Sequence, residues 1–341
     1  IKYLTKIKNR DYIRNSFIFR CVIALRHFFR SVRYRNKYYK IVHGRNTISD
    51  IRVLSIEFCS ICNLKCRYCY LEKGDRPAFL DFNIYIKLLK EVCENSEYSI
   101  KIMEWPISGG FFLHPQYKAI VEITREYKER YPHFKPWIIL NDNMMLFDND
   151  TIDFILREGV VNQIICSIDG VDKETFEYMR PNADFDRVLR NTNYLLHKNR
   201  KRKNKIVIQI NNGRDTKCAG RKPDLTLKEM FNQADLVTNW EPFNWNESFH
   251  KEQPRYAPYP FFCSFVFESV SLSASGAITK CCMDLKAATK YGDFNKDTLK
   301  TIWFSNERQS FLKAMHEGKR GVISGCDVCS INYVSRNKHT P

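Results

Sequence analysis

Residues 53–70 of this 341-residue chain read VLSIEFCSICNLKCRYCY, and this stretch decides the fold. Its first six residues, Val53–Phe58, form an apolar run that predicts a buried β-strand. Directly after it, Cys62, Cys66 and Cys69 follow one another with the spacing C-x3-C-x2-C. In a (β/α) barrel, the loops at the carboxyl ends of the strands carry the chemistry. The stretch therefore predicts a thiolate site at the mouth of a parallel barrel.

Three thiolates this close can hold one [4Fe–4S] cluster, but they cannot saturate it. The cluster has four irons and cysteine is their usual ligand, so one iron stays open to a ligand that is not protein. A zinc site is the alternative, although zinc sites usually pair C-x2-C motifs and close all four positions. The spacing favours an iron–sulfur cluster with one open iron.

The run around these cysteines resembles the radical S-adenosylmethionine (SAM) family, which carries an asparagine after the first cysteine, here Asn63, and an aromatic residue in the second gap, here Tyr68. The resemblance covers about residues 51–335. It implies that SAM chelates the open iron through its amino and carboxylate groups. It also implies that an electron from the cluster cleaves SAM to a 5′-deoxyadenosyl radical, while the protein orients and shields the cofactor.

Beyond the triad, apolar strand-like runs alternate with helical stretches, which implies a parallel sheet. The predicted strands are Val53–Phe58, Ile100–Ile107, Trp137–Asn141, Gln163–Ile168, Ile206–Ile210 and Leu236–Trp240, and the predicted helices lie near 83–95, 116–130, 150–158, 185–199 and 225–233. Six units rather than eight match the open barrel of the family. The predicted fold class is α/β, a partial (β/α)6 TIM-like barrel with a small C-terminal α+β auxiliary-cluster domain.

The family resemblance, together with the charge and composition at the two ends of the barrel, implies four parts of the chain. Residues 1–50 form a basic arm, 51–240 the radical SAM barrel, 241–262 a linker and 263–341 the auxiliary-cluster domain. The linker is rich in Pro, Asn and aromatic residues and shows no clear period.

The loop after the second predicted strand is the first candidate for binding SAM. Ser108, Gly109 and Gly110 resemble the start of the family's Gly-Gly-Glu-Pro run, and Leu113-His114-Pro115 follows as in relatives. The resemblance implies that backbone carbonyls beside these glycines hold the amino group of SAM. The family's glutamate is absent, because its place holds Phe111 or Gly110, depending on the alignment.

The end of the fourth predicted strand is the second candidate. Ser167 and Asp169 lie in a Ser-Ile-Asp-Gly sequence that resembles the family's, which implies hydrogen bonds to the two ribose hydroxyls of SAM. Arg180 follows in a loop, and either pairs with a carboxylate of SAM or substrate or forms a structural ion pair. The run Asn141–Asn143 resembles a family turn only weakly, and a surface turn fits it equally well. The sequence identifies no catalytic side chain.

The C-terminal part of the chain carries a second cysteine set, placed around a predicted hairpin over Ser269–Thr279. The set resembles the auxiliary-cluster domain called SPASM in its long form and twitch in its short form. Its members are Cys263, Cys281, Cys326 and Cys329. Long forms carry three further cysteines, and none follows Cys329 here, so the resemblance implies the twitch form. These four thiols would hold a second [4Fe–4S] cluster, with Cys282 as a rival ligand and a zinc site as the alternative.

The formal net charge of +17 is concentrated at the start of the chain. Residues 1–45 hold thirteen Lys or Arg and one acid, which gives +12, and a basic amphipathic helix is predicted over about 12–34. Arg20 and Arg26 interrupt its apolar run, which argues against a membrane span or a secretory signal. The arm either packs on the barrel or makes peripheral contact with an anionic membrane or substrate. It carries no recognisable nucleic-acid motif.

Three functions remain open. A radical SAM oxidoreductase would take hydrogen from a hydroxylated sugar-, cyclitol- or lipid-linked substrate and use the auxiliary cluster as electron acceptor. A peptide-modifying radical SAM enzyme would form a thioether, form a crosslink or invert a stereocentre. A non-catalytic Fe–S scaffold would explain the missing glutamate. The catalytic hypotheses need a small-molecule or peptide substrate and an external one-electron donor of flavodoxin or ferredoxin type. Thiolate clusters favour a reducing cytoplasm, with the arm leaving membrane association open.

Overall fold

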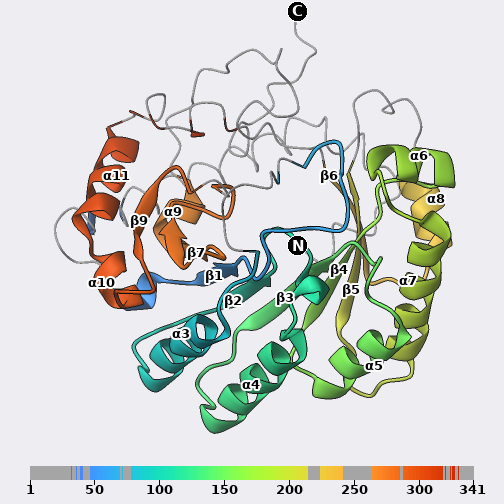
Figure 1. Ribbon diagram of the computed structural model, residues 1–341, viewed down its shortest axis with the longest axis horizontal. Coiled ribbons are helices and arrows are strands. Elements are labelled where there is room, and N and C mark those ends of the chain that lie inside the picture. Colours follow the sequence, from blue (N-terminus) through green and yellow to red (C-terminus); the bar gives the residue numbers. More distant parts are fainter. Residues whose placement is uncertain are drawn as a thin grey trace, which may run out of the picture.

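The structure is a computed structural model that describes residues 47–69, 71, 78–213, 223–240, 263–284 and 287–317, with a few single residues outside these ranges. Within them the strands form one nine-stranded sheet in the order β6-β5-β4-β3-β2-β1-β7-β8-β9 (Figure 1). The strands are β1 (Val53–Ile56), β2 (Ile102–Trp105), β3 (Trp137–Asp142), β4 (Gln163–Ser167), β5 (Val207–Gly213), β6 (Leu236–Trp240), β7 (Ser269–Leu272), β8 (Ala277–Thr279) and β9 (Lys290–Asp293).

The six strands β1–β6 are parallel, and helices connect them. In Figure 1, α3, α4, α5 and α7 line up along one side of the curved sheet. The helices of this part are η2 (Ile48–Asp50), α3 (Phe82–Glu94), η3 (Phe111–Leu113), α4 (Tyr117–Arg130), α5 (Asn149–Glu158), α6 (Lys173–Met179), α7 (Phe185–Arg200) and α8 (Pro223–Met230). This is the predicted partial (β/α)6 barrel, so the fold class expected from the sequence is confirmed.

Local sequence explains where several helices begin. An aspartate precedes each of four helices, and its side chain accepts a backbone N–H of the first turn, which satisfies one of the orphan donors there. These aspartates are Asp81 before α3, Asp148 before α5, Asp172 before α6 and Asp184 before α7. Gly159 ends α5 with a φ of 65°, a conformation that costs glycine little.

A fully buried aromatic cluster lies between β2 and the helices. Trp105 stacks on Phe111 with ring centroids 5.6 Å apart, and Phe58 meets both rings edge to face. Tyr85 of α3 completes the cluster against Trp105. Because successive residues of a strand point to opposite faces, Trp105 fixes which face of β2 meets the helices. Glu104 therefore faces the interior of the barrel.

The C-terminal hairpin extends the barrel sheet. β7 pairs in parallel with β1, and β8 and β9 follow in antiparallel order. Backbone hydrogen bonds from Arg52 to Glu268 and from Glu57 to Leu272, each 2.8 Å long, join the two segments at both ends of this pairing. The remaining helices are α9 (Ser264–Glu268), α10 (Leu299–Trp303) and α11 (Asn306–His316). The predicted hairpin is confirmed, whereas its pairing with β1 was not foreseen.

Several sequence predictions fall on residues outside the described part. They include the basic helix near 12–34, apart from Val32, and the linker over 241–262. Helix α6 was missed by the sequence analysis. Among the described residues, no helix is both long enough and apolar enough to cross a membrane.

Candidate functional site

The loop that carries Cys62, Cys66 and Cys69 leaves the end of β1 and is held on three sides. An isolated antiparallel bridge pairs Cys59 with Phe79, just before and just after the loop. The backbone of Gly110 donates to the carbonyl of Ile61 over 3.0 Å, which ties the loop to the end of β2.

On the third side, the loop meets the end of α6. The backbone N–H of Lys65 donates to Pro181 and that of Arg67 donates to Met179. The Arg67 guanidinium also donates to the carbonyl of Tyr178 over 2.7 Å and lies over its ring at 4.0 Å. The carboxyl end of α6 thus uses free carbonyls to fix the backbone between the three thiols.

Gly109 has a local requirement that no other residue meets easily. Its φ is 70°, and a Cβ added there would lie 2.1 Å from the carbonyl oxygen of Cys59 and 2.7 Å from that of Ile61. A side chain would collide with backbone atoms, which cannot move aside as a flexible side chain can. Gly109 therefore lets the end of β2 approach the cysteine loop closely.

The three thiols lie near enough to influence one another. The pKa of Cys66 is raised to about 11, chiefly by burial, while the Arg180 charge opposes the rise and Asp169, Cys69 and Cys62 add to it. The pKa of Cys69 is also raised, first by burial and then by Cys62. A cationic metal centre would offset the cost of ionising them together, so this donor set fits an iron–sulfur cluster bound at three positions.

The run Asn141–Asn143 belongs to this site. The side-chain amide of Asn143 donates to the Asn63 oxygen over 3.0 Å and lies 3.8 Å from the Cys62 sulfur. Asp142 is buried and accepts the backbone N–H of Met144 over 2.6 Å. Burial raises the pKa of Asp142 to about 7, although the Met144 hydrogen bond and the Arg180 charge both oppose the rise. This turn resembled the family only weakly in sequence, and its contact with Cys62 is visible only in the structure.

Asp169 and Arg180 form a buried ion pair beside the triad. The Arg180 Nε donates to Asp169 Oδ2 over 2.6 Å, and the Tyr68 hydroxyl donates to the same oxygen over 2.5 Å. The backbone N–H of Gly213, at the end of β5, donates to Asp169 Oδ1. Arg180 NH1 also lies 3.6 Å from the Cys66 sulfur. Both oxygens of Asp169 are thus engaged by the protein, so a ribose would share or displace these partners.

Ser108 faces a buried carboxylate. Its hydroxyl donates to Glu57 Oε1 over 2.6 Å, and the backbone N–H of Ala274 donates to Glu57 Oε2 over 2.9 Å. Glu57 is only 1% exposed. One side chain therefore joins the glycine run after β2 to the turn between β7 and β8. The role of Glu57 could not be predicted from the sequence, because nothing in the chain marks Ala274 as its neighbour.

Ser167 and Phe111 show how the remaining positions of the predicted SAM pocket lie. Ser167 ends β4 and pairs in register with Asn211 of β5, which places it among the strand ends near Asp169. Phe111 is fully buried in the aromatic cluster. Phe111 is one of the two positions that align with the family's glutamate. Its side chain therefore packs in the hydrophobic core.

The second cysteine set gathers around β7 and β8. Cys263 precedes α9, and Cys281 follows β8. The pKa of Cys281 is raised by burial, then by Cys263 and, with a smaller contribution, by Cys326. Cys282 is also enclosed, and its pKa is raised by burial and then by Glu104 in the barrel interior. Cys281 therefore lies within electrostatic reach of Cys263 and Cys326, two of the other three predicted ligands.

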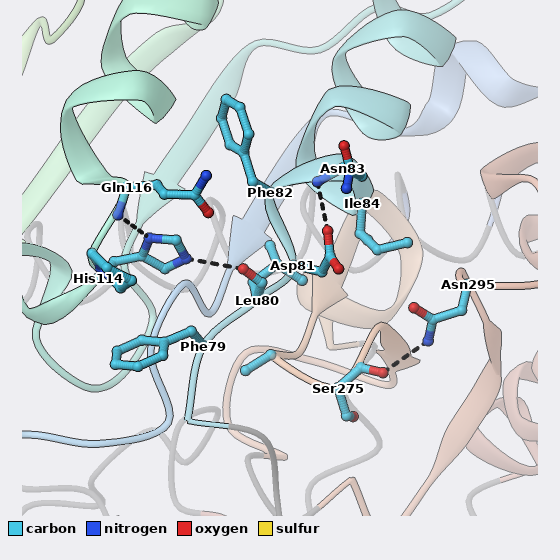
Figure 2. Close-up of a pocket in the computed structure, with 12 residues that line it drawn as sticks. Phe79, Leu80, Asp81, Phe82, Asn83, Ile84, His114, Gln116, Ser275 and Asn295 are labelled. Atoms are coloured by element: carbon cyan, nitrogen blue, oxygen red, sulfur yellow. Dashed lines mark hydrogen bonds between the residues drawn. The ribbon is translucent and has the colours of Figure 1, made fainter.

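A surface hollow of about 630 Å³ lies between the starts of α3 and α4 and the β7–β8 turn (Figure 2). His114 is fixed on its wall, because Nε2 donates to the Leu80 carbonyl over 2.9 Å and Nδ1 accepts the Gln116 N–H over 3.1 Å. Among the described residues, the wall of this hollow contains none of the predicted cluster ligands. The hollow is therefore separate from the thiolate sites.

Comparisons with known families agree with this geometry. A model described as the radical SAM superfamily matches residues 56–215, and one described as an iron–sulfur cluster-binding domain matches residues 263–330. The chain belongs to the radical SAM superfamily. It is thus a radical SAM enzyme by family, and SAM and iron–sulfur clusters are its cofactors. The first matched region contains the triad, and the second begins at Cys263.

A curated relative shares part of the radical SAM region. The chain is 25% identical over 135 residues to a GTP 3′,8-cyclase of Parasynechococcus marenigrum (strain WH8102). The match covers 39% of this chain and 38% of the relative. The chain therefore spans well under half the length of this curated relative.

Solved structures resemble a larger part of the chain. BtrN in complex with AdoMet and 2-DOIA has a TM-score of 0.55 at 16% identity, covering 84% of this chain and 94% of BtrN. Native anSMEcpe with bound AdoMet has a TM-score of 0.59 at 13% identity, and the match covers 81% of this chain and 87% of anSMEcpe. Streptococcus suis SuiB bound to precursor peptide SuiA has a TM-score of 0.58 at 14% identity, and the match covers 87% of this chain and 73% of SuiB. At such identities the likeness shows a shared fold.

Proposed function

We propose that this protein is a radical SAM oxidoreductase that takes a hydrogen atom from a hydroxylated sugar-, cyclitol- or lipid-linked substrate. Bound together, SAM and the cluster at Cys62, Cys66 and Cys69 supply a 5′-deoxyadenosyl radical. Oxidation of the substrate radical then needs an electron acceptor, and the proposed acceptor is a second [4Fe–4S] cluster in a twitch-type domain over 263–341. Its ligands would be Cys263, Cys281, Cys326 and Cys329.

The pairing of β7 with β1 carries this proposal. The strand that leads into the triad and the hairpin that follows Cys263 are neighbours in one sheet. Cys282 and Glu104 interact electrostatically, so the second cysteine set borders the barrel interior. A substrate inside the barrel would lie between the two thiolate sites, which suits removal of hydrogen on one side and of an electron on the other.

The residues near the triad have distinct proposed tasks. Gly109 and Gly110 hold the cysteine loop and leave backbone groups facing SAM. Asp169 and Ser167 would receive the ribose hydroxyls. Arg180 lies beside Cys66 and would place a positive charge near the SAM carboxylate. Burial of this arginine with Asp169 strengthens its field, because few water molecules screen it.

A peptide substrate is the second candidate. It is favoured by two of the similar structures, which were determined with peptides: SuiB with precursor peptide SuiA, and anSMEcpe with the Cp18Cys peptide. In either reaction the first cluster needs an external one-electron donor of flavodoxin or ferredoxin type. A reducing cytoplasm would keep both thiolate sets able to bind iron.

The test separates cofactor cleavage from substrate oxidation. In the Cys326→Ala, Cys329→Ala double variant, 5′-deoxyadenosine formation with dithionite should persist, because the triad is unchanged, while product formation should stop. Chromatography of both products on the same anaerobic sample measures this. The matched control is Cys93→Ala on α3, which removes a buried thiol far from both sets. Normal product formation in the double variant would contradict the electron-acceptor role.

The basic arm is proposed to attach the protein to an anionic surface. Each Lys or Arg near such a membrane contributes about 1 kcal/mol, which salt screens. The test uses a truncated chain that lacks residues 1–46 and starts at Thr47. Thr47 and Ile48 are kept because Ile48 is buried and Trp303 Nε1 donates to the Thr47 carbonyl over 3.2 Å. Sedimentation with anionic vesicles should show binding of the full chain that falls as salt rises, and none of the truncated chain. A soluble truncated chain that binds equally well would contradict the proposal.

A further inference from the structure

A row of polar residues crosses three neighbouring strands inside the barrel. Ser55 of β1 is in register with Glu104 of β2 on one side and with Ser271 of β7 on the other. Residues paired in register on parallel strands point to the same face of the sheet. Since Trp105 points to the helices, these three side chains face the interior. The row exists only because the C-terminal hairpin is paired with the barrel.

Glu104 is held in place and keeps one free oxygen. The Ser55 hydroxyl donates to Glu104 Oε2 over 2.5 Å. Within the described residues no partner engages Oε1. Burial raises the pKa of Glu104, and the Ser55 hydrogen bond opposes the rise. A carboxylate in such surroundings gains from a further hydrogen-bond donor.

Ser271 offers a second unsatisfied group in the same row. It is 1% exposed, and its hydroxyl has no hydrogen-bond partner among the described residues. Buried polar atoms are nearly always paired with protein or water, so this unpaired hydroxyl calls for a polar partner that is not among the described residues. Strands lie about 4.8 Å apart, which puts the backbones of Glu104 and Ser271 roughly 10 Å from each other. One small polyhydroxylated molecule can reach both.

The facing wall of the barrel is polar as well. Gln163 of β4 donates to Gln209 of β5 over 2.7 Å, and Gln209 donates to the Thr238 hydroxyl of β6 over 2.8 Å. Thr238 in turn donates to Asn211 over 2.9 Å, and Trp137 Nε1 donates to Gln163 over 3.1 Å. This chain of hydrogen bonds adds polar groups to an interior face that also carries Ile139 and Ile165, whereas a closed barrel is usually filled by apolar side chains alone. Such a lining suits a hydroxylated ligand better than an apolar one.

We propose that Glu104, positioned by Ser55, forms with Ser271 on the other side of Ser55 a subsite that binds a hydroxyl or ammonium group of the substrate. The inference rests on the proposed function and narrows its substrate class to polyhydroxylated molecules that are neutral or cationic at this end. The Glu104 carboxylate accepts the hydrogen bond, and the Ser271 hydroxyl pairs with a neighbouring polar group. An anionic sugar is rejected, because its carboxylate would meet Glu104 in a buried place.

The test measures ligand selectivity in the reconstituted, SAM-loaded protein by anaerobic calorimetry. Three probes are compared: an inosamine, myo-inositol and glucuronate. The unaltered protein should bind the inosamine at least tenfold more tightly than glucuronate. Glu104→Gln should weaken inosamine binding at least tenfold and myo-inositol binding less. Ser271→Ala should weaken both about threefold. Glu94→Gln, at the exposed end of α3, is the matched control and should change none of these affinities.

Iron content and SAM affinity should be equal in all variants, which shows that they are folded and loaded. Equal selectivity in Glu104→Gln and the unaltered protein would overturn the subsite, as would failure of all three probes to bind the unaltered protein. The proposed function is judged separately, because 5′-deoxyadenosine formation requires the triad and SAM rather than this row. A protein that binds the inosamine but never forms 5′-deoxyadenosine would keep the subsite and lose the oxidoreductase.

Discussion

The two cysteine sets have different electrostatic surroundings. Around the triad, opposing charge and polar side chains are close: Arg180 lowers the pKa of Cys66, and Asn143 lowers that of Cys62, each against the larger effect of burial. Around Cys281, burial raises the pKa most, the neighbouring Cys263 raises it as well, and the backbone N–H of Met283 lowers it. The Lys280 charge is the last and smallest cause there.

This contrast indicates different tasks for the two sites. The triad lies in a loop fixed by glycine, asparagine and an arginine–aspartate pair, which are groups able to receive a charged and hydroxylated cofactor. The second set is enclosed by a hairpin and packed helices, which suits a cluster saturated by protein. A cluster in an open polar site can exchange a ligand, whereas a cluster enclosed by protein can gain or lose an electron without exchanging ligands.

Removing the three triad cysteines should have the largest effect, because it should abolish one of the two proposed clusters and leave the other. With Cys62, Cys66 and Cys69 all changed to Ala, reconstituted protein should keep roughly four of about eight iron atoms, because each cluster holds four. Cleavage of SAM should be abolished, since no cluster with an open iron remains. Iron analysis and chromatography of 5′-deoxyadenosine measure both effects. Stoichiometric zinc without iron in the unaltered protein would sink the cluster assignment at both sites.

A pair of glycine variants should test whether the triad site needs the close backbone approach at Gly109. Gly109→Ala forces a Cβ into contact with the Cys59 carbonyl at a φ of 70°, and backbone strain of this kind costs about 1–3 kcal/mol before the collision is counted. Gly110→Ala meets only the Leu113 side chain at 3.1 Å, so it should be milder. SAM affinity and thermal unfolding should fall clearly in the first variant and little in the second. Equal effects would show that loop approach at Gly109 is unimportant.

A pH dependence of stability is expected on the triad side only. The pKa of Asp142 rises from 3.8 to about 7 in the folded protein, so the folded state holds the proton more tightly than the unfolded state. The contribution of Asp142 to the free energy of unfolding is fully present below about pH 4 and is lost as the pH rises to about 7. One pKa unit corresponds to about 1.4 kcal/mol, so the loss is at most about 4 kcal/mol.

Asp142→Asn should remove that pH dependence while keeping the hydrogen bond from Met144. Denaturant unfolding of iron-free protein at pH 5 and pH 8 measures it, with the unaltered protein losing more stability than the variant on going to pH 8. Asp284→Asn, beside the second cysteine set, is the comparison variant. If both variants show the same pH dependence as the unaltered protein, Asp142 is not the titrating group.

Much of the architecture could be predicted because it depends on local patterns. Apolar runs of strand length recur between amphipathic helices, and the six strands β1–β6 lie where those runs predict. The C-x3-C-x2-C spacing is likewise local, so the triad needed no tertiary information. Helix α6 was missed because its seven residues span too few turns to display a clear helical period.

The sequence by itself determined the parallel barrel and the thiolate loop after its first strand, because apolar runs, helical periods and the C-x3-C-x2-C spacing are local patterns. The second cysteine set is spread from Cys263 to Cys329, so its prediction depended on the family resemblance. Only the tertiary structure decided that β7 pairs with β1, that Glu57 joins Ser108 to Ala274, and that Glu104, Ser55 and Ser271 form one row. Strand partners and buried polar contacts depend on which distant segments pack together. A two-residue alternation specifies which face of a strand is buried, and the packing of the whole chain selects its neighbour.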